Sequence, residues 1–443
     1  MAACIAAGLS FTKATVDWSE LLTPIDLLRG KAYRVDPVPQ DANSYFVYVA
    51  YPIETFASGG MSDILSRINT QPPKSAKQVR VEDIRLPMAL QAGFPGPAVG
   101  ASGVFAKLGV AGRALVTCTM PPATGFDVTQ YANLVMQALA GGADITMDNL
   151  GLIWPDKGRY MRMLHLVGAS LNGNYGPAPQ TSSRDQAWSN ALGGTHCVNP
   201  TGPSAGETLE RAANIRQAGL TCMVVNIDTV GFALLPDLVA LAKRDRLILG
   251  ATVNYNKAAG SGGVTELVLV KLLRLAGVDM VFQSVSADPN IALGRTHVLQ
   301  DSAKITLPEG IYFDQDWMPN FAFAPPLPLL DQQIPYPGSG FFSDGFLTSG
   351  EVSRIWPASD SVGLEMGGAV FGHPDGIQAG ATAARVAVQA LTLARNEGVD
   401  YNNPTVGPQI LRDAAKECGY LQTALDLWKG TTFNYAAVEK SPF

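Results

Sequence analysis

The sequence predicts an α/β protein in which a small α+β domain, residues 1–110, precedes a (β/α)₈ TIM barrel with a C-terminal helical tail, residues 111–443. Three observations predict this class. Helical and strand-like segments alternate from about residue 113 to about residue 390, the strands are continuous apolar runs, and residues 1–110 follow a different pattern. Continuous apolar strands between helices are typical of a parallel sheet that helices cover. Several such units over this length fit a barrel.

The repeating unit begins with the β-rich segment "RALVTCTM". The next segment, "DVTQYANLVMQALAGG", has apolar residues at three- and four-residue spacing and ends at a glycine pair, which predicts a helix with its C-cap. The same order recurs in "ETLERAANIRQAGL" before "TCMVVNID", "PDLVALAKRDR" before "LILGATVNY", and "TELVLVKLLRLAG" before "VDMVFQSV". A doubly wound sheet is the alternative, but no G-x-G-x-x-G follows the first strand.

The N-terminal region and two later segments differ from this unit. The stretch "AYRVDPVPQDANSYFVYVAYPI" indicates two strands joined by a polar turn, and "GGMSDILSRI" after it indicates a helix. Residues 319–340 are rich in proline, which predicts a long barrel loop. The tail "PQILRDAAKECGYLQTALDLWKG" is amphipathic and helical, and we expect it to pack on the barrel.

Composition narrows the class of protein. Hydrophobic residues make up 47% and charged residues 16%, which indicates a globular protein with a large core. No apolar run reaches the roughly 18 residues of a membrane helix, and the opening "MAACIAAGLSF" lacks the basic flank of a signal peptide. We therefore expect a cytoplasmic protein without a membrane partner. A net charge of −6 without a basic run argues against nucleic acid as a partner.

The cysteines and histidines show no metal-binding spacing. The five cysteines lack a C-x-x-C pair, which favours thiols in a reducing compartment. The four histidines do not occur at i, i+4 or beside a cysteine pair, so the sequence does not support a zinc site.

Several long segments resemble the large chain of RuBisCO, of the form I type found in proteobacteria and cyanobacteria. They are "WSELLTPIDLLRGKAYRVDPVPQD", "VRVEDIRLP", "GIYFDQDW", "GHPDGIQAGATAARVAVQALTLARNEGVDY" and "GPQILRDAAKECGYLQTALDLWKGTTFNY". The resemblance implies an N-terminal α+β domain, a barrel, and dimers in which one chain's N-terminal domain closes the partner's active site. It also implies that the first strand of the small domain is missing.

The resemblance assigns the family's metal site to the tip of the second barrel strand, in "ALAGGADITMDNLGL". In the family a lysine there is carbamylated and binds Mg²⁺ with an aspartate and a glutamate. Here these positions hold Met147, Asn149 and Leu150, and Asp148 between them is kept. A thioether cannot be carbamylated and an alkyl group cannot bind a hard cation. The sequence therefore predicts no metal and no cofactor.

Other catalytic positions of the family are also replaced. They fall on Pro121 and Ala123 for the two lysines after strand one, Val253 and Asn254 for the His-Arg pair of strand five, and Phe282 for the histidine of strand six. No lysine lies between Lys271 and Lys304, where the family has a loop lysine over the substrate. The positions that complete the partner's site fall on Gly8, Lys13 and Ala14. We therefore predict no catalytic residue.

Six substrate-binding or phosphate-binding positions of the family are retained: Asn69, Thr119, Ser339, Gly340, Gly367 and Gly368. Ser349 and Gly350 are an alternative placement for the Ser-Gly pair, and on the first placement the next glycine becomes Phe341. The glycines can also serve backbone geometry alone, because a bisphosphate needs cationic partners.

Three more residues are candidates for a functional or structural role. Lys257 is either a replacement base or a solvated loop lysine. We expect Asp148 to be a helix-cap or turn residue instead of a metal ligand, and His373 to be a packing residue.

Three functions follow from these observations. The first is a pseudoenzyme with a structural or regulatory role, a homodimer or larger oligomer that associates with RuBisCO subunits or carboxysome components. The second is a metal-independent isomerase or lyase that acts on a small sugar phosphate. The third, an active ribulose-bisphosphate carboxylase, has the least support because it would need a new metal site. A shared fold does not by itself confer an activity.

Overall fold

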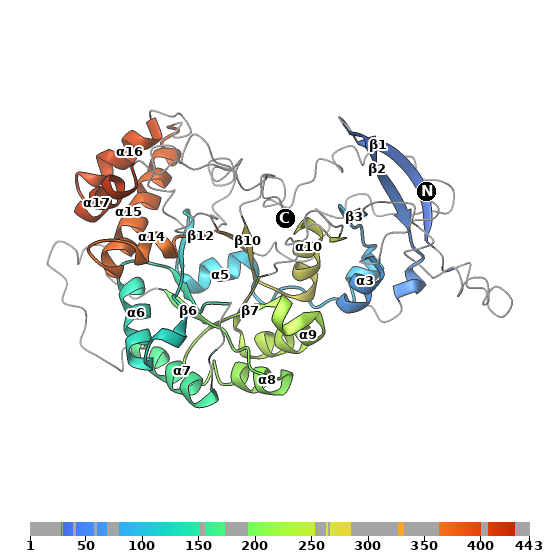
Figure 1. Ribbon diagram of the computed structural model, residues 1–443, viewed down its shortest axis with the longest axis horizontal. Helices are drawn as coiled ribbons and strands as arrows, with labels where there is room; N and C mark the ends of the chain where they lie inside the picture. The colour runs from blue at the N-terminus through green and yellow to red at the C-terminus, as the bar shows by residue number, and fades with distance from the viewer. Residues whose placement is uncertain are drawn as a thin grey trace. The chain divides into compact units, whose positions relative to one another are not determined.

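The structure is a computed structural model of the 443-residue chain (Figure 1). It describes residues 28, 30–38, 41–56, 60–68, 79–150, 154, 156–172, 194–252, 263–264, 266–284, 327–331, 363–399 and 406–429. The chain folds into two compact units. The first comprises Met1–Gly96, Asn254–Ala276 and Gly294–Ala322, and the second comprises Pro97–Val253, Gly277–Leu293 and Phe323–Phe443. The predicted domain boundary at residue 110 stays a prediction.

The first unit contains the predicted strand pair and helix. β1 (Lys31–Val38) and β2 (Asp41–Ala50) form an antiparallel hairpin, and α3 (Met61–Ile68) buries Met61, Ile64, Leu65 and Ile68 on one face. Its other elements are η2 (Ile53–Phe56), β3 (Arg80–Val81), α4 (Met88–Gln91), β9 (Gly263–Val264) and α10 (Glu266–Ala276). β3 and β9 pair in parallel.

The second unit is a closed barrel of eight parallel strands, which confirms the predicted fold class. The strands are β4 (Leu115–Thr119), β5 (Ile145–Met147), β6 (Thr195–Val198), β7 (Cys222–Asn226), β8 (Ile248–Thr252), β10 (Met280–Ser284), β11 (Leu327–Asp331) and β12 (Gly363–Glu365). Each strand pairs with the next one in this order, including β8 with β10. β12 pairs with β4, which closes the ring.

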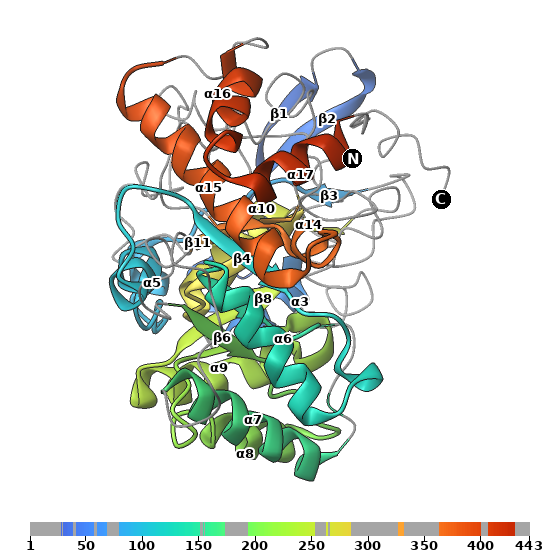
Figure 2. The same ribbon diagram turned by 90° about the vertical axis from the view of Figure 1, so that its left-hand side faces the viewer.

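Helices lie around the strands (Figure 2). They are α5 (Gly100–Leu108), α6 (Val128–Ala140), α7 (Lys157–Leu171), α8 (Ala205–Ala213), α9 (Ile227–Asp245), α14 (Gly367–Phe371), α15 (Ile377–Asn396), α16 (Val406–Ala415) and α17 (Gly419–Trp428), with the short η3 (Ala123–Gly125). α6 shows why these segments fold locally: Asp127 and Gln130 form a capping box at its start, and Gly141 is its C-cap. The predicted tail helices, α16 and α17, pack on α15 and share its core with strands β4 and β12.

The barrel interior is apolar. Its buried side chains are Leu115, Ile145, Met147, Cys197, Cys222, Val224, Ile248 and Met280. Ala101, Val104 and Leu108 of α5 join this cluster. The amides of Val99 and Gly100, at the start of α5, donate to Asp279, which directly precedes β10, so α5 lies at the N-terminal end of the barrel. The opposite, C-terminal end is where barrel enzymes place their active sites.

Two sequence expectations are wrong. The proline-rich segment 319–340, predicted as a loop, contributes strand β11, with Pro328 paired to Val281 of β10. The cysteines, predicted as thiols, include a disulfide between Cys197 and Cys222, whose Cα atoms lie 4.5 Å apart. The physical reason is register, because β6 and β7 pair in parallel and place these two cysteines opposite each other.

No helix among the described residues combines the length and the apolar character that crossing a membrane requires.

Candidate functional site

The tip of the second barrel strand holds the positions that the resemblance assigns to a metal. β5 ends at Met147, whose side chain is fully buried in the barrel core, and Leu150 packs against the same core. Asn149 is half-buried and offers an amide oxygen as the one hard ligand of the three. These residues do not fit Mg²⁺. Across the described part of the chain, no group of three or more His, Cys, Asp or Glu side chains is placed to hold a metal ion.

Asp148 follows β5 and is a buried hydrogen-bond acceptor. Its Oδ1 accepts from the hydroxyl of Tyr131 and lies 3.3 Å from Nε2 of His196. Its Oδ2 accepts from the backbone N–H of Asn199 at 2.9 Å and from the indole N–H of Trp154 at 3.3 Å. The expected cap or turn role is therefore wrong in detail, because the carboxylate joins β5 to β6 and α6 instead of starting a helix.

This environment favours the ionised form of Asp148. Burial alone would raise the pKa of Asp148, but the contacts with His196, Tyr131 and the amide of Asn199 outweigh burial and hold it below its ordinary value. Burial, and then the Asp148 charge, raise the pKa of the Tyr131 hydroxyl well above its usual range. The Tyr131 ring meets the Trp154 ring edge-on, with centroids 5.2 Å apart. Asp148 is thus saturated by structural partners.

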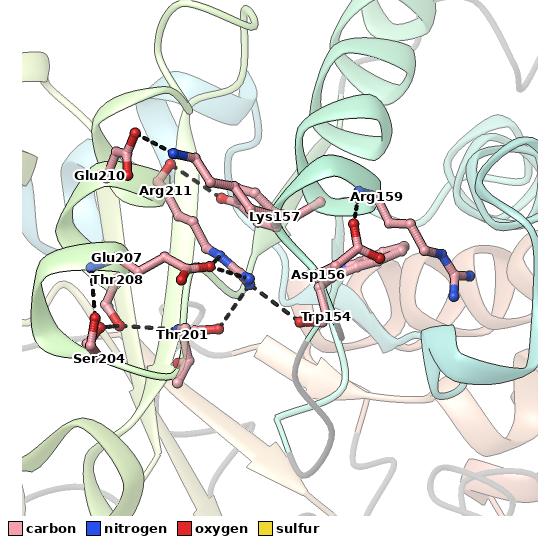
Figure 3. Close-up of polar contacts among 12 residues, drawn as sticks. Trp154, Asp156, Lys157, Arg159, Thr201, Ser204, Glu207, Thr208, Glu210 and Arg211 are labelled. Atoms are coloured by element: carbon pink, nitrogen blue, oxygen red, sulfur yellow. Dashed lines mark hydrogen bonds and ion pairs between the residues drawn. The ribbon is translucent and has the colours of Figure 1, made fainter.

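A second buried network lies beside it, at the start of α8 (Figure 3). Arg211 is 1% exposed and donates to Glu207 Oε1 at 2.6 and 2.9 Å. Its Nη1 donates to the carbonyls of Thr201 at 3.2 Å and Trp154 at 3.4 Å, and the guanidinium lies 5.0 Å from the Tyr160 ring centroid. Arg211, in the last turn of α8, therefore links α8 to the residues before α7 and to Tyr160 of α7.

The end of strand β12 carries the retained glycine pair. Glu365 Oε1 accepts the backbone N–H of Gly367 at 2.8 Å and of Thr119 at 2.9 Å. Its Oε2 lies 3.2 Å from the hydroxyl oxygen of Thr117, which also lies 3.0 Å from the carbonyl oxygen of Leu364. Glu365 therefore occupies the backbone amides of Thr119 and Gly367. The resemblance assigns both of these positions to substrate binding.

Close approach explains why a glycine stands at position 367. A Cβ atom there would lie 2.7 Å from Glu365 Oε1 and 2.9 Å from the carbonyl oxygen of Thr119. Only glycine fits this space without a shift of its neighbours. The structure therefore supports the backbone explanation for Gly367, and Gly368 follows it in α14.

The lysine positions after strand one hold side chains that cannot titrate. Pro121 follows β4, and Ala123 is buried at the start of η3.

In the first unit, Lys271 is 5% exposed and forms an ion pair with Asp83. Burial lowers the pKa of Lys271 to about 8 against the opposing effect of Asp83.

The structure describes only some of the other predicted positions. Phe282 lies in β10, opposite Leu329 of β11. His373 is buried, with its Nε2 2.9 Å from the carbonyl oxygen of Tyr420 and its Nδ1 accepting from the amide of Asp375, which confirms the packing role. The remaining predicted positions lie outside the described residues: Gly8, Lys13, Ala14, Asn69, Val253, Asn254, Lys257, Ser339, Gly340, Phe341, Ser349 and Gly350.

The sequence reasoning missed Glu365 and Arg211. Glu365 directly precedes "MGG", and a carboxylate two residues before a glycine pair at a predicted strand end was the available signal. For Arg211 the available signal was the i,i+4 spacing to Glu207, but the contact with the carbonyl of Trp154, 57 residues away, has no local signal.

A closed parallel (β/α)₈ barrel, accompanied by a unit with an antiparallel strand pair, defines a two-unit TIM-barrel protein. Comparison with known families narrows the class. The family model "Ribulose bisphosphate carboxylase large chain, catalytic domain" matches residues 186–428, and the model of the N-terminal domain of the same chain matches residues 1–90. The chain belongs to the RuBisCO large-chain family.

Individual relatives agree with this assignment. The ribulose bisphosphate carboxylase large chain of Calyptrosphaera sphaeroidea is 35% identical over 455 residues, which cover 100% of this chain and 92% of the relative. The large chains of Cyanidioschyzon merolae and Porphyridium aerugineum are 34% and 35% identical, over 100% of this chain and 87% of each relative.

Proposed function

We propose that this chain is a non-catalytic member of the RuBisCO large-chain family, derived from a form I large chain, with a structural or regulatory role. The single observation that carries the proposal is the state of the strand-two tip. Met147 is fully buried in the barrel core and Leu150 packs on it, where the resemblance calls for a metal-binding lysine and glutamate. Catalysis by a bound Mg²⁺ requires oxygen ligands that these two side chains cannot supply.

The strand-eight tip supports the same proposal. Glu365 places a negative charge on the amides of Gly367 and Thr119, within hydrogen-bonding distance of both. A phosphate at these amides would have to displace the carboxylate and would be repelled by it. The lysine positions nearby hold Pro121 and Ala123, which add no cation to offset this repulsion.

For the role, we propose a homodimer or larger oligomer that associates with RuBisCO subunits or with carboxysome components in the cytoplasm. The barrel, the tail helices and the strand pair keep their packing. A chain that has the fold of the family but other residues at the catalytic positions is suited to assembly with other chains instead of catalysis. The metal-independent isomerase or lyase remains the second candidate from the sequence, and Lys257 is the residue on which it would depend.

A carboxylation assay tests this proposal. Purified protein is supplied with Mg²⁺, labelled bicarbonate and ribulose bisphosphate, with an active RuBisCO measured in parallel. We expect no product above background from the wild type. We also expect none from Met147→Lys combined with Asn149→Asp and Leu150→Glu, because the other cationic positions stay replaced. Carboxylation by the wild type would refute the proposal. Consumption of a small sugar phosphate without bicarbonate, lost in Lys257→Ala, would favour the isomerase or lyase.

A further inference from the structure

An open cationic cavity, whose three charged side chains are exposed, lies at the N-terminal end of the barrel, the end opposite the family's catalytic positions. It has a volume of about 530 Å³ and is lined by Pro97, Ala98, Val99, Gly103, Lys107, Lys243 and Arg246. Cavities of this size hold small organic molecules. All three ionisable residues in its lining are cations, in a chain whose net charge is −6.

Rigid elements carry these cations. Lys107 lies in the last turn of α5, Lys243 lies in the last turn of α9, and Arg246 directly follows α9 as its C-cap. The cavity is therefore built on two helix ends and does not depend on a long loop. Within the described part of the chain, neither Lys107 nor Arg246 forms an ion pair with a carboxylate.

Arg246 is the strongest indication of a ligand. Its φ of 54° places it in the left-handed region, and no other non-glycine residue in the described ranges has a positive φ. Glycine is the usual residue at such a helix end because a side chain there is strained. Lysines near helix C-termini are explained by the helix dipole alone, but the dipole does not require an arginine in a strained conformation. A retained strain of this kind points to a role for the side chain.

Part of the cavity lining is apolar. Pro97, Ala98 and Val99 form this part, and Val99 packs against the barrel core. The amides of Val99 and Gly100 both donate to Asp279 Oδ1 at 2.8 Å, so they are engaged with the protein. Binding of an anion therefore rests on the three cationic side chains, while the apolar part of the lining suits a carbon skeleton.

We propose that this cavity binds a small organic phosphate, with the phosphate held by Arg246, Lys107 and Lys243. A guanidinium presents paired N–H donors that match a phosphate, and two ammonium groups add charge. This inference goes beyond the proposed function and concerns the other end of the barrel.

Calorimetric titration with pyrophosphate and with ribose 5-phosphate tests the proposal, using the full chain. We expect saturable binding at low salt that weakens as the salt rises from about 50 mM to about 500 mM, because exposed charges are screened. Arg246→Gly removes the guanidinium but places the preferred residue at the left-handed position, so it keeps the fold and does not lower the thermal unfolding midpoint. It should weaken binding at least about tenfold, as should Lys107→Glu.

Lys416→Glu is the matched control, because Lys416 is an exposed lysine near another helix end, with 71% of its side chain accessible. It should bind both probes as the wild type does. Absence of binding by the wild type would overturn the proposal. Binding that Arg246→Gly and Lys107→Glu leave unchanged would overturn it too, because the anion would then sit elsewhere.

Discussion

Buried carboxylates lie at both ends of the barrel, but Asp144 at the N-terminal end has two arginine partners, while Asp279 at the same end accepts from backbone amides. At the N-terminal end, Asp144 meets two arginines: Arg113 donates to both of its oxygens at 2.7 and 2.8 Å, and Arg385 donates at 2.8 Å. The backbone N–H of Val116 adds a bond of 2.8 Å. Asp144 is therefore held by ion pairs with two arginines.

At the C-terminal end, the donors that the structure gives for two buried carboxylates are mainly neutral groups. Asp148 is held by a phenol, an indole, an imidazole and an amide, and Glu365 by two amides and a hydroxyl. In barrel enzymes this end supplies the chemistry and the other end supplies stability. Here these carboxylates are engaged in hydrogen bonds within the protein, which agrees with the non-catalytic proposal that Met147 and Leu150 carry.

The largest loss of unfolding free energy should follow from removing Asp144, the carboxylate that two arginines share. Asp144→Ala leaves Arg113 and Arg385 without their shared partner, and loss of one member of a buried ion pair costs about 3–5 kcal/mol. Urea denaturation measures the free energy of unfolding. Asp413→Ala, which removes the partner of the exposed Lys416, is the control and should change it by less than about 0.5 kcal/mol. Equal effects of the two variants would contradict the role of Asp144.

The disulfide joins the adjacent strands β6 and β7 inside the barrel. Cys197→Ala with Cys222→Ala removes a link that spans 25 residues of sequence, and such a link contributes about 2–4 kcal/mol. The free energy of unfolding should fall by this amount in non-reducing buffer. Peptide mapping without reductant should recover the two cysteines as one linked pair, and recovery of two free thiols would disprove the link.

At the C-terminal end, Asp148→Asn should cost about 1–3 kcal/mol at neutral pH, because the amide cannot accept all the bonds that the carboxylate accepts. The pKa of Asp148 in the folded protein lies below the ordinary value of 3.8. Its contribution is therefore complete above that value and is lost as the pH falls through the folded-state pKa. The difference in unfolding free energy between wild type and variant should shrink as the pH drops below about 4. A difference that is constant with pH would show that the Asp148 charge contributes nothing.

The smallest effect should come from Glu365→Gln. The glutamine keeps an oxygen that accepts from Gly367 and Thr119, so the free energy of unfolding should fall by about 1 kcal/mol or less. Thr117→Val removes a hydroxyl that lies within hydrogen-bonding distance of both Oε2 and the carbonyl of Leu364, and its effect should also be about 1 kcal/mol. A loss of several kcal/mol in Glu365→Gln would mean that the charge itself, and not the acceptor, holds this end together.

The fold could be predicted because its signals are local. Apolar strand runs, the Asp127 cap and the Gly141 end of α6 can all be identified in short stretches of sequence. The parts that were missed depend on register and distance along the chain. The disulfide requires β6 and β7 to align Cys197 with Cys222, and β11 forms because its neighbours on both sides supply partners despite its proline.

The sequence could predict which family positions of the candidate site are replaced, but not which contacts the new residues make. The resemblance at the end of one strand was enough to identify Met147, Asn149 and Leu150 as replacements. The contact between Glu365 and Thr119 joins residues 246 positions apart, which no local pattern reveals. The same holds for Asp148, whose partners come from α6, β6 and the residues around them.

Calorimetric titration with Mg²⁺, bicarbonate and ribulose bisphosphate tests the central claim most directly. The Lys107→Glu, Arg246→Gly double variant serves beside the wild type, so that binding in the cationic cavity is separated from binding at the C-terminal end. We predict no bicarbonate-dependent Mg²⁺ binding in either protein and no saturable binding of the bisphosphate in the double variant. Bicarbonate-dependent Mg²⁺ binding, or micromolar binding of the bisphosphate that survives in the double variant, would contradict the claim that the C-terminal end has lost its chemistry.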